Sequence, residues 1–499
     1  MDIKQNFKKI DNWLFEIPQS FRSDMNVPAR IYTSEKMLQN IETNALNQLI
    51  NSTTLPGIVK YAIAMPDIHS GYGPPIGGVG AMKLPDGVIS PGFVGYDENC
   101  GIRLLKSKFT YKEIGSYLDK IGTEIQKQVP SGLGKGRTIK LSIGQINQIL
   151  EQGVPKIVEQ GYGNKTDVVN CEEQGKMKWA DASCVSDKAK NRGRNQVGTL
   201  GSGNHFCEIL KVDQIFDKSI AQVFGLFEGQ IVVMVHTGSR GLGHQNCVDY
   251  LKIVMQAMSK YKIKLPDREL ACVPFSSPEG QRFFKAMSAV SNYAWVNRQM
   301  ITYYLRMAWK KAFSSSDDLE LLYDVAHNIA KIEEHQVCPA KCCSAAILPK
   351  AKLFNRVNGQ NIKLIVHRKG ATRAFPPNHP EIPKQYQAVG QPVLIPGTMG
   401  TASYVLVGTE KSKQAWHTVC HGAGRAMSRH RAIKEISGQQ VKEKLNQQGI
   451  IIKSHSLRGI AEEAPMAYKD IDQVIEVVHQ ADLSKKVAKL LPLIIIKGE

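Results

Sequence analysis

The sequence predicts an α+β fold, in which short buried strands lead into polar loops and helices cover the strands. Four short apolar runs, each ending at a histidine, a lysine or a glycine-containing loop, favour buried strands: residues 232–235, 362–366, 393–395 and 493–496. Two longer stretches, at 114–125 and 281–312, favour helices instead. The chain of 499 residues is long enough to bury a large core.

The expected elements follow in chain order. Residues 67–101 contain nine glycines, which is typical of turns that join short strands. Ile114, Leu118, Ile121 and Ile125 have helical spacing, and Pro130 ends this helix. Residues 281–312 predict a second, long helix. A further helix is expected to carry His327, with Asp317 and Asp318 as its capping residues.

We expect one domain over residues 1–499, because the sequence shows no repeat, no long low-complexity segment and no clear linker. Residues 338–361 are expected to form a surface insertion. The alternative for this segment is a zinc site made by His335, Cys338, Cys342 and Cys343. We favour the surface insertion because that spacing matches no standard zinc module.

The chain has a net charge of +19 and a pI near 9.3. Such a charge favours a polyanionic partner, most simply nucleic acid, although a generally lysine-rich surface is the alternative. No apolar run reaches the roughly 18 residues of a membrane helix, and the N-terminus lacks the apolar stretch of a signal peptide. We therefore expect a cytoplasmic protein without membrane partners. Its ten cysteines, without framework spacing, favour reduced thiols.

Five side chains are candidate metal ligands: Asp97, Cys100, His205, His236 and His327. The cysteine and the histidines each stand where an apolar run or a glycine turn stops, and Asp97 lies three residues before Cys100 on the same glycine-flanked turn. Carboxylate, thiolate and imidazole together suit a borderline divalent metal. Alone, the first two would more often be a structural cysteine beside a capping carboxylate. Five donors exceed one tetrahedral shell but fill two if the thiolate bridges two ions, an arrangement used in phosphoryl transfer.

Glycine-containing segments at 198–208, 396–403 and 421–424 can bring backbone N–H groups close to a phosphate, although a plain tight turn is the alternative for each. His421 is the candidate nucleophile, since imidazole attacks phosphorus readily; a further metal ligand is the competing interpretation. Lys497 follows four apolar residues, so we expect a strand to hold it in place. Arg240 and Arg425 lie in glycine loops and are expected to contact phosphate or RNA.

These segments, in their order along the chain, resemble the RtcB family of RNA ligases over nearly the whole length. The residues that carry the resemblance lie in ten motifs, at 65–73, 97–101, 198–205, 236–245, 327–331, 367–377, 397–404, 421–425, 462–465 and 496–498. The resemblance implies an RtcB-like mixed fold with β-sheets lining a deep, metal-containing active-site cleft, surrounded by helices.

The resemblance also implies a reaction. Enzymes of this family use GTP and two manganese ions to join RNA 2′,3′-cyclic phosphate or 3′-phosphate ends to 5′-hydroxyl ends. A histidine takes GMP from GTP, and the GMP then activates the RNA 3′ end as RNA-3′-pp-5′-G. Transfer-RNA halves, in tRNA splicing, and other cleaved RNAs, in RNA repair, are the implied partners. The resemblance leaves open whether an archaease-like activator is needed.

By resemblance, His421 is the guanylylated histidine. Asp97, Cys100 and His205 are similar to the ligands of one manganese ion, and Cys100, His236 and His327 to those of the other. Glu98 departs from the family pattern and is expected to add negative charge beside the metals. The implied GTP site comprises Asn204, His205, Phe206, Cys207, Glu208, His327, Asn328, Pro396, Gly397, Thr398, Met399, Ser403, His421, Gly422, Ala423, Gly424 and Lys497.

Two alternatives remain at this point. A dinuclear metal phosphoesterase acting on cyclic-phosphate RNA ends would need the same metal ligands, but it would not need His421, Lys497 or the loops for GTP. An RNA-binding protein with a decayed active site would not be expected to keep every ligand together with the nucleophile.

Overall fold

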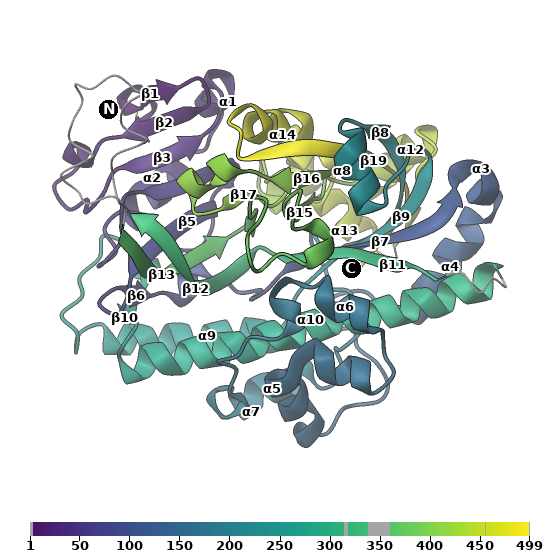
Figure 1. The fold of residues 1–499 in the computed structure, drawn as a ribbon, viewed down its shortest axis with the longest axis horizontal. Coiled ribbons are helices and arrows are strands. Elements are labelled where there is room, and N and C mark those ends of the chain that lie inside the picture. Colours follow the sequence, from purple (N-terminus) through teal and green to yellow (C-terminus); the bar gives the residue numbers. More distant parts are fainter. Residues whose placement is uncertain (1–2, 314–317, 338–359, 455, 499) are drawn as a thin grey trace.

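The computed structural model describes residues 3–313, 318–337, 360–454 and 456–498, and it has two large β-sheets with helices around them (Figure 1). This confirms the predicted α+β class. Residues 338–359, which make up most of the expected insertion and include Cys338, Cys342 and Cys343, lie outside the described residues, as does Asp317. Within the described ranges, none of the helices combines the length and the apolar character that a membrane-spanning segment requires.

The first sheet has seven strands in the order β1-β2-β3-β4-β5-β13-β12. All neighbours are antiparallel except β3 and β4, which run parallel. The strands are β1 (Lys8–Asp11), β2 (Leu14–Ile17), β3 (Ala29–Tyr32), β4 (Ala62–His69), β5 (Ile76–Lys83), β13 (Gln360–Lys369) and β12 (Asn328–Val337).

The second sheet follows the order β11-β7-β9-β8-β19-β16-β15, and β18 pairs with β19 in parallel. Its strands are β11 (Glu320–Ala326), β7 (Gly101–Thr110), β9 (Gln230–Thr237), β8 (Phe206–Ile215), β19 (Ser484–Lys497), β16 (Ser403–Gly408), β15 (Pro392–Ile395) and β18 (Ile451–Lys453). Two small pairs complete the strands: β6 (Val88–Ile89) with β10 (Val273–Pro274), and β14 (Ala371–Arg373) with β17 (Thr418–Cys420).

The helices pack on the outer faces of the sheets and between them. They are α1 (Glu35–Gln39), α2 (Thr43–Ser52), α3 (Tyr111–Ile114), α4 (Leu118–Gln128), α5 (Ile143–Glu159), α6 (Lys165–Val169), α7 (Asp187–Gly193), α8 (Lys218–Phe224), α9 (Arg240–Ala257), α10 (Pro278–Phe313), α11 (Arg429–Glu435), α12 (Gly438–Gln447), α13 (Leu457–Glu462) and α14 (Ile471–Gln480). The expected helices at 114–125 and 281–312 are confirmed, although a 3₁₀ turn interrupts the first at Gly115–Tyr117.

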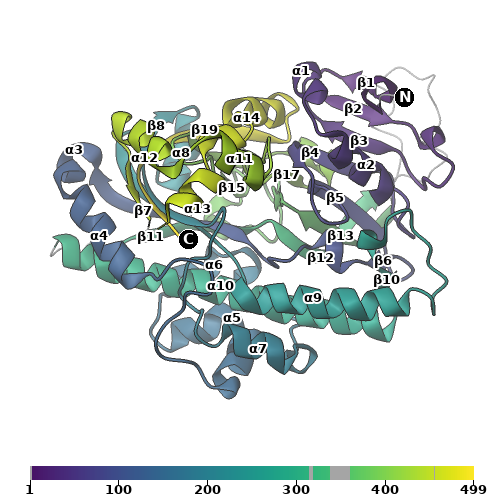
Figure 2. The same ribbon diagram turned by 180° about the vertical axis from the view of Figure 1, so that it is seen from behind.

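Helix α10 is a long helix that runs along both sheets, and α5 and α7 pack on its opposite side (Figures 1 and 2). It is buried over most of its length, with polar residues such as Asn297 and Arg298 buried as well as Tyr293, Trp295 and Trp309. A helix buried in this way contacts several elements. Its N-terminal half joins α9, α5 and the first sheet in one core, while its C-terminal half joins α4 and the second sheet in another.

The chain crosses from one sheet to the other at His327, which alone separates β11 from β12. The predicted helix around His327 is therefore wrong. Strand β11 is buried at every residue after Glu320, Asp324 included, so it lacks the alternation of apolar and polar residues that would distinguish a strand from a buried helix. Asp318 pairs with Lys310 at 3.1 Å, at the end of α10, rather than capping a helix of its own.

Candidate active site

The register of the second sheet brings distant parts of the chain to one edge. His236 in β9 lies opposite Ile102 in β7 on one side and opposite Phe206 in β8 on the other. Phe206 in turn lies opposite Lys497, the last residue of β19. The segments just before β7 and β8 therefore converge where β9 and β19 end. Strand ends in a sheet are rigid supports for functional side chains.

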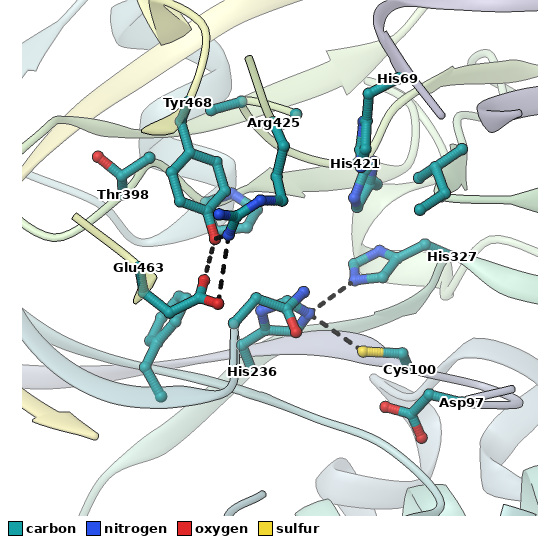
Figure 3. Close-up of a pocket in the computed structure, with 18 of the residues that line it drawn as sticks. His69, Asp97, Cys100, His236, His327, Thr398, His421, Arg425, Glu463 and Tyr468 are labelled. Carbon is teal, nitrogen blue, oxygen red and sulfur yellow. Dashed lines mark hydrogen bonds and ion pairs between the residues drawn. The ribbon is translucent and has the colours of Figure 1, made fainter. Parts of the chain in front are cut away.

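The five predicted metal ligands form two overlapping groups at this edge: Cys100 with His236 and His327, and Cys100 with Asp97 and His205. Within each group the ligand atoms lie within 4.8 Å of one another. Cys100 Sγ is 3.1 Å from His236 Nε2, and His327 Nε2 is 3.4 Å from His236 Nε2 (Figure 3). Cys100 Sγ also lies 3.5 Å from His205 Nε2. Sharing of one thiolate by both groups is the geometry that the sequence predicted for two adjacent ions.

The electrostatics of the histidines His236 and His327 and of Asp97 fit metal ligation, whereas burial and the charge of Asp97 raise the pKa of the Cys100 thiol. Burial lowers the pKa values of His236 and His327 well below the ordinary value, so both imidazoles are neutral and keep a lone pair for an ion. Burial opposes ionisation of Asp97, but hydrogen bonds to His205 and Ser239 lower its pKa to about 2. The Asp97 carboxylate is also oriented by Ser239, whose N–H donates to Oδ1 at 2.9 Å. This set of nitrogen, oxygen and sulfur donors suits a borderline divalent metal.

Backbone geometry holds the Asp97–Cys100 turn in place. Asn99 has a positive φ of 53°, and its carbonyl accepts from Arg298 Nη1 at 2.8 Å. Arg298 also donates to Thr237 O, at the end of β9, and pairs with the buried Asp324. Helix α10 therefore fixes the ends of two strands that carry metal ligands. A Cβ on Gly238 would lie 2.5 Å from Asp97 Oδ1, so only glycine leaves room for the carboxylate.

His421 follows directly after β17 and is held by Asp67, a buried residue of β4. The Asp67 Oδ2 atom lies 2.6 Å from His421 Nδ1 and accepts the His421 N–H at 3.0 Å. Burial would raise the pKa of Asp67, but the charge and hydrogen bonds of His421 lower it below the ordinary value. Because Nδ1 is bound to this carboxylate, Nε2 is the ring nitrogen available to a substrate. The His421 ring lies 5.3 Å from that of His327, centroid to centroid.

A cavity of about 380 Å³ opens beside the metal-ligand groups and His421 (Figure 3). The sequence-predicted site residues that line it come from segments more than 300 residues apart: Asp97, Cys100, Asn204, Phe206, Glu208, His236, His327, Asn328, Pro396, Gly397, Thr398, Met399, His421, Gly422, Ala423, Gly424 and Lys497. His205 joins them through the metal-ligand group with Asp97.

Lys497 is buried as expected, and its ammonium donates to Gly203 O. Burial lowers its pKa, opposed by the nearby carboxylates of Glu463 and Glu208. Burial also raises the pKa of Glu208 to about 8. One wall of the cavity is therefore a set of buried ionisable groups that can exchange protons or hydrogen bonds with a polar ligand.

Two residues of the predicted GTP site do not present their side chains to the cavity. Cys207 alternates with Phe206 and Glu208 along β8, so its thiol packs in the core on the opposite face. Ser403 is buried, and its Oγ accepts the Gly397 N–H at 3.0 Å. This hydrogen bond stabilises the loop that contains Gly397, so the Ser403 hydroxyl does not point at the cavity.

One expectation about charge needs correction. Glu98 does not add a negative charge beside the metals: it is fully buried, accepts from Asn246 Nδ2 at 2.9 Å, and burial raises its pKa to about 8. Arg240 donates to Thr199 Oγ1 and to the carbonyls of Gly132 and Lys135, which holds its guanidinium between loops, and its contact with phosphate or RNA stays a prediction. Arg425, by contrast, lines the cavity.

Several residues of the site were missed by the sequence analysis: Asp67, which contacts His421, and the cavity-lining His69, Lys369, Glu463 and Tyr468. The last two form one hydrogen-bonded unit with Arg425, whose guanidinium also lies 5.0 Å from the Tyr468 ring. Glu463 and Asp67 lie inside motifs that had been quoted for the resemblance. No periodicity or spacing places them beside His421, because their strands and loops meet only in three dimensions.

The fold and the site together define a class: an α+β enzyme with a buried cysteine–histidine centre that could hold two ions beside an aspartate-oriented histidine. A family model described as tRNA-splicing ligase RtcB matches residues 48–498. The chain is 48% identical to the tRNA-splicing ligase RtcB of Thermococcus kodakarensis, over 98% of both chains. It is 48% identical to that of Methanococcus maripaludis, over 99% of this chain and all of the other.

A bacterial relative, the RNA-splicing ligase RtcB of Mycobacterium bovis, is 47% identical over 90% of this chain and the whole of its own length. The chain therefore belongs to the RtcB family, and it is an RNA ligase.

Proposed function

We propose that the protein joins RNA 2′,3′-cyclic phosphate or 3′-phosphate ends to 5′-hydroxyl ends, using GTP and two manganese ions, through a guanylylated His421. The observation that carries this proposal is the position of His421: Asp67 binds its Nδ1, and its ring borders the same cavity as the metal ligands. Transfer-RNA halves and other cleaved RNAs are the proposed substrates, in the cytoplasm, with residues 1–499 acting as one catalytic domain.

In the first step, His421 Nε2 attacks the α-phosphorus of GTP, the bond to the β-phosphate oxygen breaks, and pyrophosphate leaves. Asp67 keeps the proton on Nδ1 and stabilises the positive charge that the ring acquires. When bound to Asp97, Cys100, His205, His236 and His327, two manganese ions would neutralise phosphate charge and polarise phosphorus–oxygen bonds.

The later steps restore the histidine. Water opens the cyclic phosphate, and an oxygen of the resulting RNA 3′-phosphate attacks the phosphorus of the histidine-bound GMP, which releases His421. The RNA 5′-hydroxyl then attacks the activated 3′-phosphorus, and GMP leaves. The order is chemically sound because a phosphate monoester lacks a good leaving group until GMP is attached. Arg425 and Lys497, which line the cavity, are the cations proposed to hold phosphate oxygens.

Incubation with α-labelled GTP and manganese tests the proposal. Wild-type protein should retain label through a bond that acid breaks and alkali spares, as a phosphoramidate does. The His421→Ala variant should retain no label and join no RNA, with its manganese content nearly unchanged. Label on the variant would exclude His421 as the nucleophile. Opening of cyclic phosphates by wild-type protein without any guanylylation would favour the dinuclear phosphoesterase instead.

A further inference from the structure

A second cavity, of about 520 Å³, lies in the helical layer and shares no lining residue with the catalytic one. It is bounded by α5, by α10 and by the two segments at 137–141 and 194–197. Helix α5 packs on the side of α10 that faces away from the sheets (Figure 2). A cavity of this size is in the range that holds a nucleotide or a drug-sized ligand.

The lining of this cavity has the chemistry of a nucleotide site. Three cations, four amide side chains and two tyrosines line it, together with an apolar floor and no carboxylate: Arg137, Lys156, Arg194, Gln145, Gln148, Gln160, Asn195, Tyr162, Tyr304, Ile149, Ile157, Val197 and Met300. Aromatic and flat apolar surfaces stack on bases, amides bind base edges, and cations bind phosphates. Among the described residues that line the cavity none is a carboxylate, and Glu159 beside them pairs with Lys156 at 3.3 Å.

Contacts within the protein hold Arg137 in position in the cavity wall. Its guanidinium carbon lies 3.5 Å from the centroid of the Tyr304 ring, and its Nη2 donates to Gln128 O at 2.9 Å and to Gly198 O at 3.2 Å. Its Nε is buried and has no hydrogen-bond partner within the described part of the chain. A buried donor without a partner is costly, so a ligand that supplied an acceptor here would be favoured.

The same segments connect the second cavity to the catalytic one. Upstream of Arg137, Ser131 Oγ donates to Lys497 O at 3.4 Å. Arg240 Nη2 donates to Gly132 O and Lys135 O, each at 3.1 Å. Downstream, residues 195–204 run from this cavity to Asn204 in the catalytic cavity. The two cavities therefore share supporting segments, because residues 195–204 contribute Asn195 and Val197 to one wall and Asn204 to the other.

We propose that this cavity binds an unpaired nucleotide of the RNA substrate, at a distance from the ends that are joined. The proposal rests on RNA being the substrate of the catalytic site. RNA is favoured over a free nucleotide because the chain is an RNA ligase and because one segment, 195–204, contributes to the walls of both cavities. The site would add affinity for long RNA without taking part in bond formation.

The test compares the double variant Gln148→Glu/Lys156→Ala with Gln439→Glu/Lys442→Ala, which makes the same changes at exposed positions of α12. Binding is measured with a 3′-phosphorylated RNA of about twenty nucleotides and with a 3′-phosphorylated dinucleotide. The cavity variant should bind the long RNA ~10-fold more weakly, because it loses one cation and gains one carboxylate in the cavity wall. Its dinucleotide affinity and its guanylylation should match those of the control variant.

Crosslinking of 4-thiouridine-containing RNA to wild-type protein provides a readout that does not depend on variant folding. Peptides containing Tyr162 or Tyr304 should carry crosslinked RNA. Equal weakening of long RNA by both variants, or an absence of these crosslinks, would overturn the proposal. The proposal would also be overturned if the cavity variant lost affinity for the dinucleotide as strongly as for the long RNA, because that result would indicate a mononucleotide site. If RNA crosslinked at this cavity but the protein showed no guanylylation, the proposed reaction would be wrong and the proposed RNA site would still be supported.

Discussion

Asp67 is the residue whose role is most sharply defined by geometry, because one oxygen contacts both Nδ1 and the backbone N–H of His421. We predict that Asp67→Asn lowers the rate of guanylylation on the order of 10²–10⁴-fold, since an amide stabilises the imidazolium less well and permits the wrong tautomer. Rapid-quench measurement of label incorporation checks this. The exposed Asp86→Asn is the matched control and should keep the wild-type rate.

The pH dependence of the Asp67 interaction has a definite sign. The pKa of Asp67 is lowered in the folded protein, so its contribution to stability is complete above the unfolded value and disappears as pH falls through the folded value. At neutral pH the carboxylate is therefore ionised. A rate for Asp67→Asn equal to that of the wild type at neutral pH would contradict the orienting role.

Cys100 is shared by both metal-ligand groups, whereas each histidine belongs to one. We predict that Cys100→Ala lowers the manganese content to well under one ion per chain, while His236→Ala keeps roughly one, because only the thiolate can serve both ions. Elemental analysis after dialysis checks the ratio. Cys272→Ala, a buried cysteine outside these groups, should leave metal content unchanged. Equal losses in Cys100→Ala and His236→Ala would show that the thiolate binds one ion at most.

The role of a single residue could be predicted from the sequence where a polar side chain stands at an unusual place, such as the end of an apolar run. A thiol, a carboxylate and histidines at the ends of apolar runs indicated the metal centre, and the structure brings all five together. Arginines were harder to interpret. Arg368 is fully buried against Glu333 at 2.5 Å, and Arg373 pairs with Glu381 at 2.8 Å. The sequence does not reveal these partners: Glu333 lies on the neighbouring strand β12, and Glu381 lies in the loop after β14.

At the scale of elements, the loop after β17 depends on a glycine. Gly424 has a φ of +70°, and a Cβ there would lie 2.1 Å from Asp67 O. We predict that Gly424→Ala displaces the His421 loop, costs more than 2 kcal/mol in stability and nearly abolishes guanylylation. Denaturant unfolding and label incorporation check the two effects.

Gly449→Ala is the matched control for backbone strain. Its φ of +76° is similar, but no heavy atom lies within 4 Å of the added Cβ. It should cost about 1 kcal/mol from the unfavourable φ alone and leave guanylylation intact. If both variants lost the same stability and kept activity, close packing against Asp67 would not be what requires glycine at 424.

Helices and strands could be predicted from the sequence where the spacing of nearby apolar residues indicates them, and not where distant pairing decides them. The helix at 281–312 and the strands that lead to His236, His367 and Lys497 follow from apolar spacing and length. The strand before His327 was mistaken for a helix because it is buried on both faces and therefore shows no alternation. Its pairing with β7, more than 200 residues away, decides its conformation, and that pairing has no local signal.

At the scale of the whole molecule, the sequence predicted the α+β class but not the way the two sheets meet. The active site exists because β11 ends one sheet and β12 begins at the edge of the other, with His327 between them. Its wall exists because Lys497, at the end of the last strand, lies opposite Phe206. Such pairings depend on long-range packing, so the site was recognisable as a set of residues before its shape could be derived.

The net charge of +19 carries the last prediction. If the charge serves RNA binding, phosphate contacts release counterions, and the logarithm of the affinity for single-stranded RNA falls with the logarithm of salt with a slope of about −0.7 per contact. We predict a slope steeper than about −2, corresponding to three or more contacts. Guanylylation should depend on salt less strongly, since it requires no long polyanion.

Fluorescence anisotropy of labelled RNA between about 50 and 400 mM salt provides the measurement. The variant Gln148→Glu/Lys156→Ala should have a slope shallower by about 0.7 if Lys156 contacts one phosphate, while Gln439→Glu/Lys442→Ala should keep the wild-type slope. Both variants change the net charge by the same amount. A difference between their slopes therefore reports a phosphate contact at the cavity and not the net charge of the protein. A wild-type slope near zero would mean that the charge is a general property of a lysine-rich surface and does not serve RNA binding.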